Sequence, residues 1–302
     1  MQGIRAHGRT AVDIDDRRLV GFCARCARSV AGRVAEKVIA SQYINADDTG
    51  LPVLERDHPN GVKRGHLWAY SGAGLVAFHY TPNWKADGPA EFLDGFRGHL
   101  QGDGYAGYEK ALRDAMDGDT EIVPAERRLG CGMHIRRKFE EAAKLGDVRA
   151  AVAINFFKAI YNLEREYKEH KLSSEDRLAQ RTLRSVPLVD ELYQWIRDVK
   201  PQAIPKTPLY DAARYAEKQE AAWRRCFSDG QFEIDNGEAE RRLRWVALGR
   251  KNFLFAGSDA GAESACVCAM HASALSVARA RQASGVVGRA DTVQQPGADG
   301  AS

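Results

Sequence analysis

Hydrophobic residues near the start of the chain recur at the spacing of one face of a helix. They are Leu19, Phe22, Cys26, Val30, Val34 and Val38. Steps of three or four residues are the period of an amphipathic α-helix, which buries this face and exposes the opposite one. We therefore predict an N-terminal helical lead-in within residues 1–41.

The next stretch changes to the short apolar runs that are typical of β-strands. The predicted elements are strands at 43–47 (extended by 51–54), 66–70 and 75–80, a helix at 86–96, a strand at 99–101, a helix at 104–116 and a strand at 121–129. Ser71–Gly74 has the small, glycine-rich sequence of a hairpin loop. This order of elements predicts a mixed α/β sheet covered by helices.

From Cys131 to about Phe227 the periodicity is helical. The predicted helices span residues 150–169, 174–184, 188–199 and 209–227. This block is either a separate helical domain or a helical insertion that returns the chain to the sheet. Beyond Gly257 the pattern fades, and residues 280–302, rich in Gly, Ala, Gln and Ser, predict disorder.

Composition excludes several classes of protein. With 44% hydrophobic and 28% charged residues among 302, the chain has enough apolar material for a core. A net charge of +3, from 44 basic and 41 acidic residues, excludes a histone-like polycation but leaves local patches open. No apolar run approaches the ~18 residues that span a membrane. We therefore expect a cytoplasmic protein.

The cysteines favour buried thiols over zinc or disulfides. They are Cys23, Cys26, Cys131, Cys226, Cys266 and Cys268. Six in a chain of this length are too few for a disulfide framework. Cys23 and Cys26 lie on the apolar helix face, and the spacing of the later pair does not suit a second half of a zinc site. Cys131 and His134 also lack a partner pair, so we expect a packed cysteine and a histidine that is hydrogen-bonded nearby or touches DNA.

Two aspartates lie at the ends of predicted strands. Asp47 and Asp48 are neighbours on one strand, so their side chains point to opposite faces and only one can serve a shared site. Asp103 lies between two glycines at a junction of strand and helix, which leaves its carboxylate accessible. The alternative for Asp103 is a helix N-cap.

A third carboxylate, Glu240, lies on a predicted helix near the C-terminal end of the pattern. Asp235 and Glu238 have the positions of helix-starting residues, and Glu238 can pair with a later arginine as a surface charge. Glu240 instead shares a face with Leu243 and Ala247, at the edge of the apolar stripe. A carboxylate in such a place needs a cation.

Two aspartates and a glutamate at one sheet edge would suit a pair of divalent cations. Magnesium (or manganese) prefers oxygen ligands and keeps positions open for water and phosphate. Two such ions about 3.5–4 Å apart support in-line transfer at a phosphodiester. We therefore take Asp47, Asp103 and Glu240 as candidate ligands and catalytic residues.

Basic clusters lie next to two of these segments in the sequence. Residues 241–251 carry five basic and no acidic side chains, and a second cluster runs from Arg127 to Lys138. Such runs are often solvated helix faces, but beside candidate metal ligands they fit phosphate-backbone binding better. The candidate DNA contacts are His134, Arg136, Arg137, Lys138, Arg241, Arg244, Arg250 and Lys251.

Several blocks of this sequence resemble the signatures of the insertion sequence 66 transposase family. They are Leu100–Tyr108, Gly130–Phe139, Ile234–Arg241 and Gly249–Gly257, together with Ala46–Thr49, Ile160–Arg165 and Phe227–Gly230. The blocks follow the family's order, and the resemblance runs from about Val34 to about Ala265.

The resemblance implies an α/β fold: an RNase H-like mixed sheet with a large helical insertion between the second Asp and the Glu. Carried over by motif, the family's Asp, Asp and Glu are Asp47, Asp103 and Glu240, separated by 56 and 137 residues. The implied domains are residues 42–139 (first part of the catalytic domain), 140–230 (helical insertion), 231–268 (return helix with the Glu) and 269–302 (divergent, disordered tail).

The implied activity is DNA transposition, a form of DNA recombination by a mobile element. A DDE transposase with two Mg²⁺ or Mn²⁺ ions cuts at the element's ends and joins the freed 3′-hydroxyl to target DNA. The expected partners are these DNAs, further copies of the chain on DNA and possible other proteins of the same element, with no membrane.

The sequence also departs from the family pattern. Asp48 stands for the usual Glu, Gly237 for the second Asn of an Asp-Asn-Asn run, and Gly132 for an aromatic residue. The family's long N-terminal region is missing, and the tail after about Cys268 diverges. Two alternatives therefore stay open: a catalytically dead, DNA-binding remnant, and an RNase H-like nuclease that acts on RNA–DNA hybrids.

Overall fold

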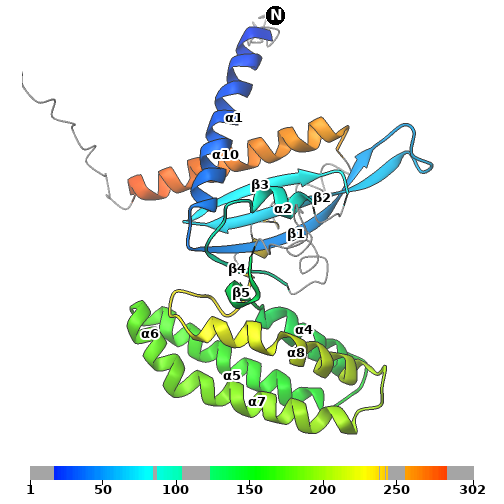
Figure 1. The fold of residues 1–302 in the computed structure, drawn as a ribbon, viewed down its shortest axis with the longest axis vertical. Coiled ribbons are helices and arrows are strands. Elements are labelled where there is room, and N and C mark those ends of the chain that lie inside the picture. Colours follow the sequence, from blue (N-terminus) through cyan, green and yellow to red (C-terminus); the bar gives the residue numbers. More distant parts are fainter. Residues whose placement is uncertain are drawn as a thin grey trace, which may run out of the picture.

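The computed structural model describes residues 17–83, 87–103, 123–237, 239–241, 243 and 256–283. A sheet with its covering helices and a separate group of helices lie one above the other (Figure 1), and each has its own hydrophobic core. The fold is the predicted α/β class, an RNase H-like mixed sheet that carries a helical insertion. None of the helices within the described ranges is long and apolar enough to cross a membrane.

Five strands form the sheet in the part of the chain that the structure describes. They are β1 (Tyr43–Leu54), β2 (Val62–Gly72), β3 (Leu75–Thr81), β4 (His99–Gln101) and β5 (Arg128–Leu129). Their order is β3-β2-β1-β4-β5. The long strands β1, β2 and β3 pair antiparallel, whereas β4 and β5 run parallel to β1. The parallel side of the sheet is therefore the side that connects to the helical unit.

The predicted hairpin is confirmed. β2 and β3 are joined at Ala73 and Gly74, whose φ angles are +51° and +73°. Positive φ at both central residues is the signature of a type I′ turn, which matches the twist of the two strands. β1 is one continuous strand that includes both predicted runs.

Three elements between β3 and α4 differ from the prediction. The predicted helix at 86–96 is shorter, because α2 (Asp87–Phe92) ends before Gly95, whose φ of +74° does not continue a helix. Of the predicted strand at 121–129, residues 121–122 lie outside the described residues, and within 123–129 only β5 is strand, because a 3₁₀ turn, η1 (Ala125–Arg127), follows Pro124. The predicted helix at 104–116 lies outside the described residues.

Two long helices, α1 (Arg17–Ile39) and α10 (Asp259–Ala283), cover the sheet at β3 (Figure 1). The predicted N-terminal helix is thus confirmed. Residues 269–283 correct the predicted disordered tail, because they continue α10. Its buried positions step by four, at Ala262, Cys266 and Met270, but Ala, Ser and Gly occupy most other positions and hide that period. Residues 284–302 lie outside the described residues.

The packing of α10 can be tested with its two cysteines. Cys266 is buried against the sheet, whereas Cys268 on the same helix is exposed. We expect Cys266→Ser to lower the free energy of unfolding by about 1–2 kcal/mol, because the hydroxyl would enter an apolar site. Cys268→Ser is the matched control and should leave stability unchanged. Denaturant unfolding measures both; equal effects would contradict the docking of α10.

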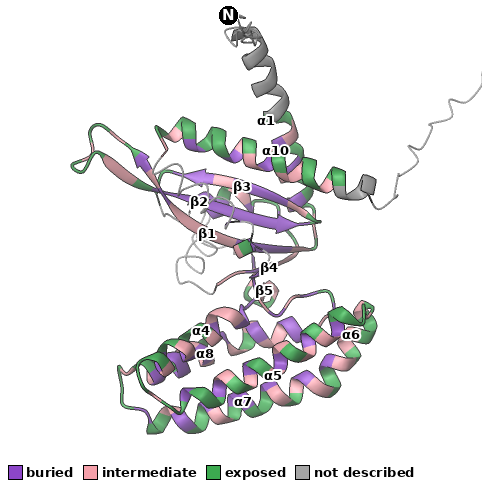
Figure 2. Ribbon diagram, turned by 180° about the vertical axis from the view of Figure 1, so that it is seen from behind, coloured by how far each residue is buried: buried purple, intermediate pink, exposed green. Residues whose placement is uncertain are grey.

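The helical unit consists of four long helices and one short one. They are α4 (Gly132–Lys144), α5 (Ala150–Glu169), α6 (Ser174–Gln180), α7 (Val186–Val199) and α8 (Pro208–Arg224). Their inward faces are almost continuously buried (Figure 2), around an aromatic centre in which Trp223 contacts Phe157, Tyr193 and Phe227. The predicted helix at 150–169 has the observed bounds.

The helical unit begins earlier in the chain than residue 140. Ile135 and Phe139 of α4 lie in the core of the helical unit, against α5 and α8. Leu129 of β5 belongs to the same core. The insertion therefore grows directly out of the last strand, and α4 is shared between the sheet's edge and the helices.

Candidate active site

The parallel pairing of β1 and β4 brings Asp47 and Asp103 to one edge of the sheet. Asn45 of β1 is in register with Gln101 of β4, and each aspartate follows its own strand partner by two residues. Asp103 lies beyond the end of β4, and its charge acts on Asp47, so the two carboxylates lie near one another. The Tyr215 hydroxyl of α8 donates a hydrogen bond of 2.6 Å to the Asp103 carbonyl oxygen and fixes the backbone there.

Glu240 follows the helical insertion in the sequence, and the chain brings it back to this edge of the sheet. It lies on a helical turn that begins after Asn236, and the Glu240 amide donates to the Asn236 carbonyl. The fully buried Asn236 side chain donates through Nδ2 to the carbonyl oxygen of Ala46, at 2.7 Å. Ala46 immediately precedes Asp47, so this bond attaches the helix of Glu240 to the strand of Asp47.

The three carboxylates act on one another electrostatically. Burial, followed by the nearby charges of Glu240 and Asp103, raises the pKa of Asp47 to about 8. A carboxyl group with neighbours of the same charge resists ionisation unless a cation joins them. Asp47 of β1, Asp103 after β4 and Glu240 of the return helix therefore lie within electrostatic reach of one another, and their role as a site stays a prediction.

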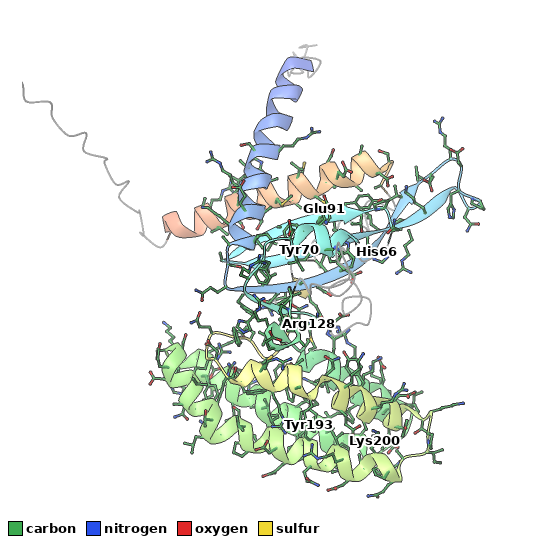
Figure 3. The ribbon with its side chains drawn as sticks, in the orientation of Figure 1. His66, Tyr70, Glu91, Arg128, Tyr193 and Lys200 are labelled. Atoms are coloured by element: carbon green, nitrogen blue, oxygen red, sulfur yellow. The ribbon has the colours of Figure 1, made fainter. Side chains whose placement is uncertain are left out.

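Asp48, the neighbour of Asp47, points to the opposite face of β1 and pairs with a histidine there. Its Oδ2 lies 3.0 Å from Nδ1 of His66 on β2; the His66 side chain is buried and that of Asp48 is partly buried (Figure 3 labels His66). This pair lies across β1 and β2, where it holds the two long strands together. Asp48 is thus excluded from the site that Asp47 lines, as predicted.

Two basic side chains of α4 face Glu240. Nε2 of His134 lies 3.5 Å from Oε1 of Glu240, and a guanidinium nitrogen of Arg137 lies 3.6 Å from the same oxygen. They are one helical turn apart, so one face of α4 borders the site. Burial lowers the pKa of His134, and the charges of Asp103 and Glu240 oppose that shift. Arg137 is 49% exposed and has room for a further contact.

The other candidate DNA contacts differ in how far the structure describes them. Arg136 pairs with Glu140 at 2.7 Å and Lys138 with Glu141 at 3.3 Å, both on α4 itself. Arg241 follows Glu240 and is exposed. Arg244, Arg250 and Lys251 lie outside the described residues. DNA contact by these eight residues stays a prediction.

The three carboxylates fit divalent cations by their chemistry. Among the described residues, no three or more His, Cys, Asp or Glu side chains already close around a metal-sized site. The mutual charge of Asp47, Asp103 and Glu240 nevertheless favours a hard cation with oxygen ligands, such as Mg²⁺ or Mn²⁺. Cys131 is buried, as predicted, and its Sγ accepts a hydrogen bond from the Asn236 amide at 3.2 Å.

Sequence reasoning missed Gln101, the polar residue that connects the parts of the site. Its side chain is fully buried two residues before Asp103. Oε1 accepts from Asn45 Nδ2 at 2.7 Å and from the Tyr43 hydroxyl, both on β1. Nε2 donates to the carbonyl oxygens of Gly130, at 2.8 Å, and Glu233, at 2.9 Å. An amide at an inward strand position was the available signal, since it must find buried partners.

Comparison with known proteins agrees with the sequence motifs. The family model described as Transposase IS66 family matches residues 5–264. The uncharacterized protein y4hP of Sinorhizobium fredii (strain NBRC 101917 / NGR234) is 30% identical over 270 residues, which cover 82% of this chain and 47% of y4hP. The uncharacterized protein y4qI of the same strain is 32% identical over 244 residues, covering 77% of this chain and 44% of y4qI.

The chain thus spans about half the length of these curated relatives. The family model, in contrast, covers most of this chain, from the N-terminal helix α1 through the sheet and the helical insertion to the start of α10. The chain belongs to the IS66 family of transposases.

Proposed function

We propose that this chain is the catalytic core of a transposase that cleaves DNA and transfers a strand by a DDE mechanism with two divalent metal ions. The observation that carries the proposal is the convergence of Asp47, Asp103 and Glu240, whose charges, with burial, raise the pKa of Asp47 to about 8. Three mutually repelling carboxylates at a sheet edge are unfavourable alone and become favourable around cations.

Asp47, Asp103 and Glu240 would hold the two ions. When bound, Mg²⁺ or Mn²⁺ would supply activation of the attacking oxygen and stabilisation of the leaving oxygen of a phosphodiester. The chain itself contributes orientation. His134 and Arg137 face Glu240 from α4, and Tyr215 holds the backbone at Asp103.

The DNA is expected to lie along α4 and the return helix. Arg137 is half exposed beside the carboxylates, so a phosphate entering the site would meet a guanidinium next to the acidic group. Arg136, Lys138 and Arg241 would extend this contact along the backbone, with the salt dependence of phosphate binding. Element ends, target DNA and further copies of the chain on DNA are the proposed partners.

The experiment that tests this function is a nicking and strand-transfer assay on DNA that contains the element's ends. We expect products with Mg²⁺ or Mn²⁺ and none with EDTA. A full-length family member in the same conditions is the positive control. Activity of that control without activity of this chain, together with intact DNA binding, would identify a catalytically dead remnant; cleavage of RNA–DNA hybrids alone would identify a nuclease.

A further inference from the structure

Residues 228–236, the return segment, lead from the helical insertion back to the helix of Glu240. They form neither helix nor strand, so their carbonyl groups are not satisfied by regular structure. Side chains from the insertion and the sheet bind these carbonyl oxygens instead. The segment is therefore fixed from outside, by residues far away in the sequence.

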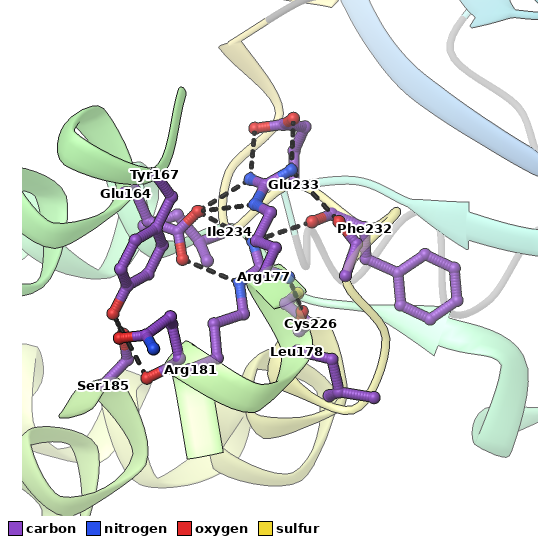
Figure 4. A network of polar contacts seen from close by, with 12 residues as sticks. Glu164, Tyr167, Arg177, Leu178, Arg181, Ser185, Cys226, Phe232, Glu233 and Ile234 are labelled. Carbon is purple, nitrogen blue, oxygen red and sulfur yellow. Dashed lines mark hydrogen bonds and ion pairs between the residues drawn. The ribbon is translucent and has the colours of Figure 1, made fainter. Parts of the chain in front are cut away.

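Arg181 makes the largest share of these contacts, and its side chain is 0% exposed. It opens η2 (Arg181–Ser185), a π-helical turn that separates α6 from α7. Its Nη1 donates to the carbonyl oxygens of Cys226, at 3.0 Å, and Asp229, at 2.7 Å, and Nη2 donates to Phe232, at 2.9 Å (Figure 4). One guanidinium group thus binds the chain just before the return segment, at Cys226, and at two places within it.

Arg177, one turn earlier, binds the middle of the same segment. Nη1 donates to the carbonyl oxygen of Gly230 at 3.1 Å and to Oε1 of Glu233 at 3.2 Å. Nη2 lies 3.3 Å from Oε2 of Glu233. Lys168 of α5 reaches that oxygen as well, at 2.7 Å. The return segment is therefore held through the side chain of Glu233 as well as through its backbone carbonyl groups.

Glu164 of α5 orients both arginines. It is buried, and its two oxygens bind Arg181 at 2.7 and 2.8 Å (Figure 4). Arg177 adds bonds of 2.7 and 3.2 Å to Oε2. A buried carboxylate between two guanidinium groups sets their planes in fixed directions, which a single ammonium group could not reproduce.

One residue of the sheet and two of the helices α4 and α8 hold the other end of the return segment. Gln101 donates to the Glu233 carbonyl oxygen, and the Trp223 indole and the Gly132 amide both donate to that of Ile234, at 2.9 Å each. Asn236 then binds Ala46, beside Asp47. These bonds restrict the backbone conformation from Asp229 to Asn236, directly before the helical turn that carries Glu240.

We propose that Arg181 and Arg177 are positioning residues: through the return segment they set the place of Glu240 relative to Asp47 and Asp103. The inference rests on the proposed function in one respect, which is that the three carboxylates bind metal together. The helical insertion then forms part of the active site, since it fixes the third ligand from a distance. Metal ligands commonly depend on such outer contacts.

A purely stabilising role would place the bonds differently. Arg184 of η2 and Glu166 of α5 form an exposed ion pair of 2.6 Å between the same two segments, and this pair touches nothing of the return segment in the contacts described. Arg181 instead directs two bonds to carbonyl oxygens of the return segment, at Asp229 and Phe232, and a third to the carbonyl oxygen of Cys226. The pair Arg184–Glu166 is therefore a natural control for Arg181–Glu164.

The test uses the full chain with Arg181→Lys and the control Arg184→Lys. We expect Arg181→Lys to fold, by circular dichroism, and to increase hydrogen exchange in peptides covering residues 231–241 without metal. Its Mn²⁺ affinity should fall by about 10- to 100-fold, the usual effect of losing an outer contact. Arg184→Lys should change neither measurement. If Arg181→Lys does not fold, Arg177→Gln replaces it in the same measurements, with the same expected results, because Glu164 then stays paired with Arg181.

Two results would overturn the inference. One is unchanged exchange in residues 231–241 of a folded variant; the other is faster exchange with Mn²⁺ affinity equal to that of the wild type. Failure of the proposed function has a different signature: wild-type Mn²⁺ binding that Asp103→Asn does not weaken. In that case the exchange measurement still decides whether the arginines fix the return segment.

Discussion

Replacing Asp103 with asparagine is expected to reduce metal-dependent DNA nicking by about a thousandfold or more, while DNA affinity is kept. A bound metal ion supplies several kcal/mol of transition-state stabilisation, and each 1.4 kcal/mol is worth about tenfold in rate. Asparagine has nearly the size of aspartate, and the backbone at residue 103 is held by Tyr215. The change therefore removes the charge and leaves the local structure.

DNA affinity should be kept because the carboxylate repels phosphate in the absence of metal. Asp94→Asn is the matched control, since Asp94 is exposed at the end of α2 and outside the site. Single-turnover nicking and a binding titration at fixed salt give the two quantities. Wild-type nicking by the Asp103 variant would remove this residue from the proposed ligand set, and loss of binding would indicate a structural role.

The sequence predicted each carboxylate but could not predict their meeting. Strand alternation separated Asp47 from Asp48, and the pair of Asp48 with His66 confirms that separation. The meeting of Asp47 with Asp103 depends on the parallel register of β1 and β4, and β4 has only three residues. So short a strand carries too little pattern to specify a register.

Where the prediction differed, tertiary contacts decided the structure. The family resemblance implies a first catalytic segment that ends at residue 139, yet Ile135 and Phe139 pack among the insertion helices. The helix α10 extends to Ala283 although small residues obscure its apolar period. No sequence pattern predicts the partners of Gln101 and Arg181. Only the fold gives them buried carbonyl partners.

The second large effect concerns stability in the absence of metal. The pKa of Asp47 is raised from an ordinary value of 3.8 to about 8 in the folded protein. Between these values the folded state binds a proton that the unfolded state has lost, so stability falls as pH rises from about 4 to about 8. Asp47→Asn removes the titrating group. We expect the free energy of unfolding of the variant to exceed that of the wild type by about 5 kcal/mol at pH 8.5 and to equal it near pH 4.

Denaturant unfolding across this pH range in EDTA measures the difference, with Asp94→Asn at an exposed position as control. A difference that does not grow with pH would show that the charges near Asp47 are too distant to matter. Divalent metal supplies the complementary test. Because an ion that binds only the folded state stabilises it in proportion to its affinity, Mg²⁺ should raise wild-type stability at pH 8.5 and leave Asp47→Asn almost unchanged. The same carboxylate that destabilises the empty site would then stabilise the loaded one, as expected of a ligand retained for metal binding at the expense of stability.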